Sequence, residues 1–129
     1  MRAIYRVSAF VMLLLSAASL NAVNMRFLKD APLTRLNSDE LKVFREFLVK
    51  TLDETPQGTT VEWTAPKTVF NSKITPQKSA SDGSFKCRQA RIESKSSDRQ
   101  ASGDYWFCKS DKAGWQFRTP SKNAKVENQ

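Results

Sequence analysis

The chain has 129 residues, of which 40% are hydrophobic and 26% charged, with 21 Lys and Arg, 13 Asp and Glu, and no histidine. This length accommodates one domain and no second core of useful size. The lack of histidine excludes mechanisms that need an imidazole base or imidazole metal ligand, and two cysteines are too few for an all-cysteine zinc site. The net charge of +8 fits an anionic partner or merely a soluble surface, and does not distinguish them.

Residues 1–22 have the pattern of a secretory signal peptide, in which two arginines precede an apolar or small stretch from Val7 to Leu20. A retained membrane anchor is the alternative, but this stretch is shorter than the roughly 20 residues that span a bilayer. Cleavage after Ala18 and cleavage after Ala22 both fit the pattern. We therefore expect an exported mature chain without a transmembrane segment, located in the periplasm, at the outer membrane or at the cell surface.

One amphipathic helix is expected from about Ser38 to Asp53. Asn37 is a favourable N-cap residue, and Glu40 three positions later completes the pattern of a capping box. Apolar residues then recur at the spacing of one helical face, at Leu41, Phe44, Leu48 and Leu52. A face of this kind packs into the core or binds a partner helix, and core packing is the commoner outcome.

After Gly58 the chain changes to short runs of β-branched and aromatic residues separated by turn residues. We expect strands at 59–63, 69–75, 85–94, 102–109 and 115–118, with prolines ending the first two. Residues 121–129 are expected to form a polar, frayed tail. The sequence thus predicts a single α+β domain over residues 23–120, in which one N-terminal amphipathic helix packs on a four- or five-stranded antiparallel β-meander.

Cys87 and Cys108 are an even pair in a chain expected to reach a compartment where disulfides persist. If Ser97 and Asp98 form the two-residue turn between the third and fourth strands, the cysteines lie opposite each other, within bridging distance. Two buried free thiols are the alternative. A bridge closes a loop of about 20 residues, worth about 3 kcal/mol. The wide spacing indicates a structural bond rather than a redox centre.

Several short motifs in order span about Phe27 to Phe117. They are Phe27-Leu28-Lys29-Asp30-Ala31-Pro32-Leu33, Leu52-Asp53, Gly58, Trp63-x-x-Pro66, Ile74-Thr75-Pro76, Cys87-Arg88, Cys108-Lys109 and Gly114-Trp115. In these motifs the chain resembles the bacterial 17 kDa surface-antigen-like family, the C-terminal domain of rickettsial-type outer-membrane surface antigens.

The chain departs from this family at several points. It lacks the lipid-attachment cysteine and the glycine-zipper segment that often precede the domain, so membrane anchoring does not carry over. Lys109 stands where the family has arginine, and Thr64-Ala65 replaces the usual glycine-bearing turn. The resemblance implies a cell-envelope protein with Cys87 and Cys108 at the positions expected to pair, and it supplies no catalytic residues.

The basic excess belongs to the C-terminal half of the chain. Val23 to Trp63 holds six basic and seven acidic residues, whereas Thr64 to Gln129 holds thirteen basic and six acidic residues. Acidic residues are scattered and no cluster has metal-ligand spacing, so we expect no catalytic residue, no metal and no cofactor. The basic residues interleave with aromatic ones, which indicates either anion binding or a solvated basic face over an aromatic core. The candidate anion-binding residues are Lys86, Arg88, Arg91, Lys95, Arg99 and Lys109.

The sequence therefore predicts a non-enzymatic, exported cell-envelope protein, an interaction or structural module. Its basic sheet half is expected to contact an anionic envelope component or a protein partner. Export argues against nucleic acid as that partner, and the sequence indicates no oligomeric state. The alternative is a small secreted hydrolase, or an inhibitor of an extracytoplasmic enzyme. A hydrolase needs a concave pocket with convergent polar groups, such as two carboxylates or a Ser–Lys pair.

Overall fold

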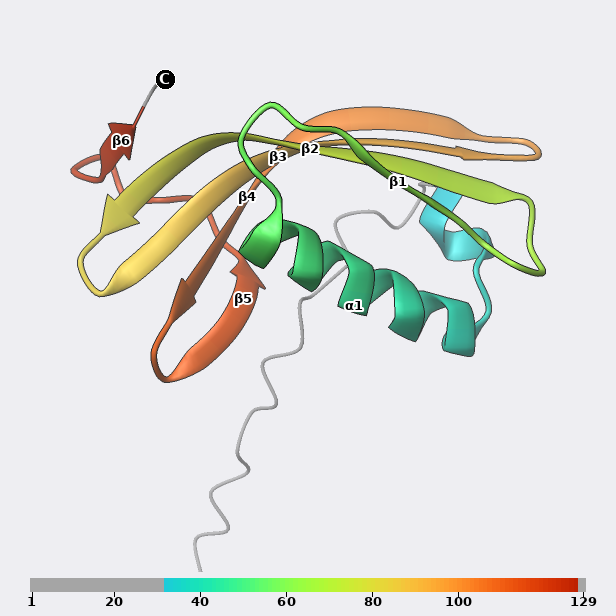
Figure 1. Ribbon diagram of the computed structural model, residues 1–129, viewed down its shortest axis with the longest axis horizontal. Coiled ribbons are helices and arrows are strands. Elements are labelled where there is room, and N and C mark those ends of the chain that lie inside the picture. Colours follow the sequence, from blue (N-terminus) through green and yellow to red (C-terminus); the bar gives the residue numbers. More distant parts are fainter. Residues whose placement is uncertain (1–31, 128–129) are drawn as a thin grey trace, which may run out of the picture.

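The computed structural model describes residues 32–127 of the chain. The predicted signal peptide (residues 1–22) and the first motif of the family resemblance up to Ala31 lie outside these residues. In the described part, the α-helix α1 (Ser38–Glu54) lies across one face of a curled antiparallel sheet, after a short 3-10 helix, η2 (Pro32–Arg35) (Figure 1). We call this face of the sheet the inner face and the opposite one the outer face.

Six strands form the sheet in the described part of the chain. Five of them follow one another as a meander, in the order β1-β2-β3-β4-β5, and β6 pairs with β2 beyond the end of β1. The strands are β1 (Val61–Thr64), β2 (Phe70–Asp82), β3 (Phe85–Ser96), β4 (Gln100–Ser110), β5 (Ala113–Phe117) and β6 (Lys125–Glu127). The predicted α+β arrangement of one helix on an antiparallel meander is confirmed.

Helix α1 begins and ends within one residue of its predicted limits, because its N-terminal signal is local. The Asn37 side chain accepts a hydrogen bond from the Glu40 N–H at 2.8 Å, so the predicted capping box forms. The apolar face of the helix packs on the inner face of the sheet, where Phe44, Leu48 and Leu52 are at most 1% exposed. The helical stripe is therefore core.

Strand β2 continues through Pro76, where the sequence predicted its end. The Pro76 carbonyl accepts a hydrogen bond from the Gly58 N–H at 2.7 Å, on the side of β2 that faces away from β3. A strand residue directs its nitrogen and its carbonyl to the same side, so the missing N–H of Pro76 breaks no bond with β3. A register shift between Pro76 and Ser79 follows, and the strand then runs on to Asp82.

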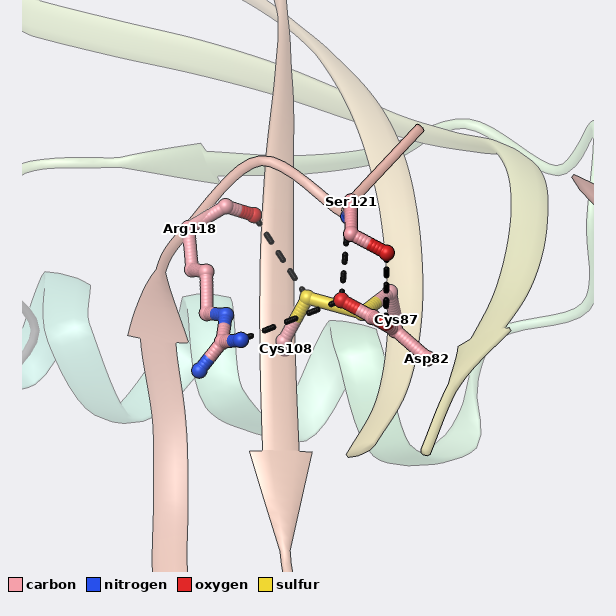
Figure 2. Close-up of a disulfide and its surroundings, with 5 residues drawn as sticks. All are labelled: Asp82, Cys87, Cys108, Arg118 and Ser121. Carbon is pink, nitrogen blue, oxygen red and sulfur yellow. Dashed lines mark hydrogen bonds and ion pairs between the residues drawn. A yellow bond between two sulfur atoms is a disulfide. The ribbon is translucent and has the colours of Figure 1, made fainter. Parts of the chain in front are cut away.

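The C-terminal segment is not a frayed tail over the residues that the structure describes. Lys125–Glu127 pairs with Ser79–Ser81, at the part of the β2 edge that β1 does not reach. Before this strand, the backbone N–H and the hydroxyl of Ser121 donate to the Asp82 carboxylate at 3.0 and 2.8 Å (Figure 2). The prediction failed because the segment has no apolar pattern, and its order comes from a distant sheet edge.

The disulfide prediction is confirmed. The β3–β4 pairing places Cys87 opposite Cys108 through the predicted two-residue turn, and the two Cα atoms lie 4.0 Å apart. The bond belongs to a small outer-face cluster with Ala80, against which Phe85 and Trp106 pack. The segment that follows β5 carries Arg118 and Ser121 past the disulfide (Figure 2). The guanidinium of Arg118 lies 4.0 Å from the centre of the Phe85 ring.

Candidate functional site

The six predicted anion-binding residues are divided between the two faces of the sheet. Side chains alternate along β3, so Lys86 and Arg88 lie on the inner face, together with Lys109, which is opposite Lys86 on β4. Arg91 and Lys95 lie on the outer face, and Arg99 follows the turn between β3 and β4. The structure therefore brings three of the six together and separates the other three from them.

The outer-face cations have acidic neighbours. The Arg91 guanidinium lies 3.3 Å from an Asp104 oxygen and 3.8 Å from a Glu93 oxygen. Lys95 lines a polar hollow of about 470 Å³ that also contains Glu62, Lys73 and Glu93. Carboxylates thus lie among the cations of the outer face, which carries mixed charge rather than a continuous basic surface.

The three inner-face cations converge on a groove of about 360 Å³ at the C-terminal end of α1. Here the last turn of the helix lies beside β4 and β5 (Figure 1). The wall contributed by the sheet contains Lys86, Arg88, Lys109, Ser79, Ser81 and Glu127. We call this the basic groove.

Arg88 joins the sheet to the end of the helix. Its guanidinium donates to the backbone carbonyl of Leu52 at 2.7 Å, which satisfies one of the carbonyls left without a partner in the last helical turn. A positive charge at this end also opposes the negative end of the helix dipole. Burial lowers the pKa of Arg88. The hydrogen bond to Leu52 holds the half-buried side chain of Arg88 in a fixed position in the basic groove.

Asp53 connects the helix to both β4 and β5. One of its oxygens, Oδ1, accepts from the Lys109 ammonium at 2.7 Å and from the Trp115 indole N–H at 2.8 Å. The hydrogen bond from Lys109 has the largest effect on the pKa of Asp53, which it lowers, and the hydrogen bond from Trp115 lowers this pKa further. The same three residues also line a second, larger groove of about 800 Å³ along α1 and the β4–β5 hairpin. Their contact therefore separates two adjoining grooves.

Lys86 differs from the other two cations of the basic groove. It has no ion-pair partner within residues 32–127, and its cross-strand neighbours are Ser81 on β2 and Lys109 on β4. Directly opposed like charges on neighbouring strands repel each other. Asp53 offsets the charge of Lys109, whereas no carboxylate of the described chain forms an ion pair with Lys86. Lys86 is thus a cation of this groove that an external anion can reach.

Sequence reasoning missed several residues of the basic groove. Asp53 and Trp115 were expected as the ends of a helix and a strand and as part of motifs of the family resemblance, not as site residues, and Glu127 lay in the tail expected to be frayed. Ser81 lies opposite Lys86, but no hydrogen bond joins their side chains in the structure. No group of three or more candidate metal-binding side chains occurs within residues 32–127.

No protein family, no curated protein and no solved structure matches this chain. The resemblance to the 17 kDa surface-antigen-like family therefore stays a prediction. None of the helices formed by residues 32–127 has the length and apolar character needed to cross a membrane.

Proposed function

We propose that this protein is an exported, non-enzymatic binding module of the cell envelope. Its basic groove holds an anionic group of an envelope component or of a partner protein. The observation that carries this proposal is the convergence of Lys86, Arg88 and Lys109 on one concavity in which Lys86 is unpaired.

The geometry of the groove favours anion binding over a merely solvated basic surface. A concave site with low-dielectric walls concentrates the field of its cations more than a flat surface does. Arg88 uses one of its five N–H donors on the Leu52 carbonyl, and the guanidinium stays in place while other donors contact a ligand. On the outer face, by contrast, the charge of Arg91 is offset by the carboxylates of Asp104 and Glu93.

Binding of the mature chain to isolated envelope material tests the proposal. We expect the fraction that sediments with the material to fall as salt is raised, because salt screens interactions between exposed charges. Lys86→Gln should weaken binding about two- to fivefold, the range expected for one partly exposed ion pair. Lys95→Gln removes the same charge from the outer face and should leave binding unchanged. Equal losses in both variants, or binding that does not depend on salt, would refute the proposal.

The hydrolase alternative rests on the position of Ser81 opposite Lys86. A lysine that activates a serine nucleophile accepts its proton through a direct hydrogen bond, and that bond is absent between these two side chains in the structure. The geometry supports binding better than catalysis. If Ser81→Ala left envelope binding intact but abolished a hydrolytic activity of the wild-type chain, this ranking would be reversed.

A further inference from the structure

We propose that the basic groove recognises a zwitterion rather than a polyanion. The anionic group of the ligand lies at Lys86 and Arg88, and a cationic group a few bonds away lies at Glu127 and Asp53. This inference rests on the proposed function and specifies the ligand class of the same site. Its basis is that carboxylates lie on both sides of the cations in the groove.

Strand β6 places Glu127 in the wall of the groove. Glu127 is paired with Ser79 of β2, and Ser79 is paired with Arg88 of β3, so the three form one row on the inner face. The neighbouring row contains Lys86, opposite Ser81. Two strand spacings separate Glu127 from Arg88, a distance of about 10 Å between their Cα atoms. No ion pair joins Glu127 to any cation of residues 32–127, so its charge also remains available.

Asp53 supplies a second acceptor on the helix side. Both of its hydrogen bonds, from Lys109 and from Trp115, go to Oδ1. The other oxygen, Oδ2, accepts no hydrogen bond in the described chain. The groove thus has an unpaired ammonium at Lys86, an unpaired carboxylate at Glu127, and an open acceptor oxygen on Asp53, whose other oxygen is bonded to Lys109.

This charge arrangement discriminates between classes of ligand. A polyanion carries further negative groups beside the one bound at Lys86, and these are repelled by Glu127 and Asp53. A simple anion pairs with the cations of the groove but makes no favourable interaction with its carboxylates. A ligand with an ammonium close to its phosphate or carboxylate satisfies both, and a groove of about 360 Å³ has room for such a small headgroup.

Two soluble phosphodiesters that differ in their headgroup provide the test. Glycerophosphoethanolamine carries an ammonium on a two-carbon headgroup, whereas glycerophosphoglycerol carries two hydroxyls on a three-carbon headgroup and no positive charge. Each is titrated into the isotope-labelled mature chain, with the Trp115 indole N–H as an NMR reporter at the edge of the groove. We expect the dissociation constant of glycerophosphoethanolamine to be at least about threefold lower, the contribution of one partly exposed charge pair.

The sign of the effect of Glu127→Gln is decisive. We expect this variant to weaken binding of glycerophosphoethanolamine about two- to fivefold and to strengthen binding of glycerophosphoglycerol slightly. Glu93→Gln, which removes a carboxylate from the outer face, is the matched control and should change neither. If Glu127→Gln strengthens binding of both diesters, the groove is a simple anion site and the zwitterion inference is wrong while the proposed function stands.

Lys86→Gln tests the proposed function itself, whereas Glu127→Gln tests the ligand class. Lys86→Gln should weaken binding of both diesters, because both place a phosphate at this lysine. If it changes neither, the proposed function fails together with the inference; if neither diester binds, the inference alone is overturned. Vesicles of phosphatidylethanolamine and of phosphatidylglycerol then distinguish a membrane-held headgroup from a free one. Retention on the first alone assigns the ligand to a lipid surface, and retention on neither, with binding of the soluble zwitterion, assigns it to a free ligand.

Discussion

The two faces of the sheet differ in how they are held together and in what their charges do. The inner face is covered by α1 and η2 over a large apolar cluster that includes Leu48, Phe70 and Phe107. Within residues 32–127, the buried cluster of the outer face consists of Ala80 and the disulfide, under the segment that runs from β5 to β6. The inner face also holds the basic groove, whereas on the outer face Arg91 is neutralised by Asp104.

This difference shows that the number of cations on a strand says little about binding. Lys86 and Lys95 are both exposed lysines of β3, and they differ in the face on which they lie. Lys86 lines a groove together with Arg88, whose guanidinium is held against the end of α1, whereas the hollow lined by Lys95 contains no arginine. The position of a lysine relative to the end of the helix therefore decides whether a fixed guanidinium lies beside it.

The largest expected effect concerns the apolar contact between helix and sheet. Leu48 is 0% exposed, and Leu48→Ala should lower the free energy of unfolding by about 2–5 kcal/mol. Val43→Ala on the same helix is the control, because Val43 is 47% exposed and its truncation should cost less than about 1 kcal/mol. Both are measured by urea denaturation of the mature chain. Equal losses of the free energy of unfolding in the two variants would show that the buried face of α1 does not stabilise the inner core.

The outer face should depend on its covalent bond instead. Replacing both Cys87 and Cys108 by alanine should lower the free energy of unfolding by about 3 kcal/mol. Hydrogen exchange should then accelerate first in β6 and in the segment that precedes it, since these cover the bond. The helical circular dichroism signal should persist. Faster exchange throughout α1, with β6 unchanged, would contradict the separation of the two faces.

A smaller effect is expected from Glu40, which links the start of α1 to the loop before β2. The Thr68 hydroxyl donates to its carboxylate and lowers its pKa, against the raising effect of burial. The backbone N–H groups of Lys67 and Thr68, each at 3.2 Å, lower it further. A pKa lowered in the folded state contributes stability that is fully present above the ordinary glutamate value of about 4.3. That stability is lost as the pH falls through the lowered pKa.

Glu40→Gln should therefore flatten the loss of stability between neutral and acidic pH. Glu46→Gln is the control, because it removes a carboxylate from the exposed side of the same helix. The measurement is the free energy of unfolding of the three chains at several pH values. The assignment is wrong if both variants lose stability on acidification as steeply as the wild type.

Features of the fold with local causes could be predicted from the sequence. The N-terminus of α1 follows from Asn37 and Glu40, which bond within one turn. The register that pairs Cys87 with Cys108 follows from the two residues of the Ser97-Asp98 turn. In both cases the decisive contacts lie within a few residues, so composition and spacing are sufficient.

The features of the fold and of the site that could not be predicted depend on contacts between distant segments. Pro76 stays inside β2 because Gly58 lies beside it, and no pattern around the proline indicates that neighbour. Strand alternation puts Lys86 and Arg91 on opposite faces, but it does not indicate which carboxylates lie near them. Glu127 reaches the basic groove only because β2 extends beyond β1 and leaves an edge for β6. The candidate residues were thus predictable individually, and their grouping was not.

The central claim is that anions bind at the inner-face groove and not over the basic half of the chain as a whole. The most direct test is an NMR titration of the labelled mature chain with inorganic phosphate. The account predicts shifts confined to the amides of Ser79, Ser81, Lys86 and Arg88 and to the Trp115 indole N–H. Shifts of equal size at Arg99 and at Lys95, Arg91 and the other outer-face residues would contradict it.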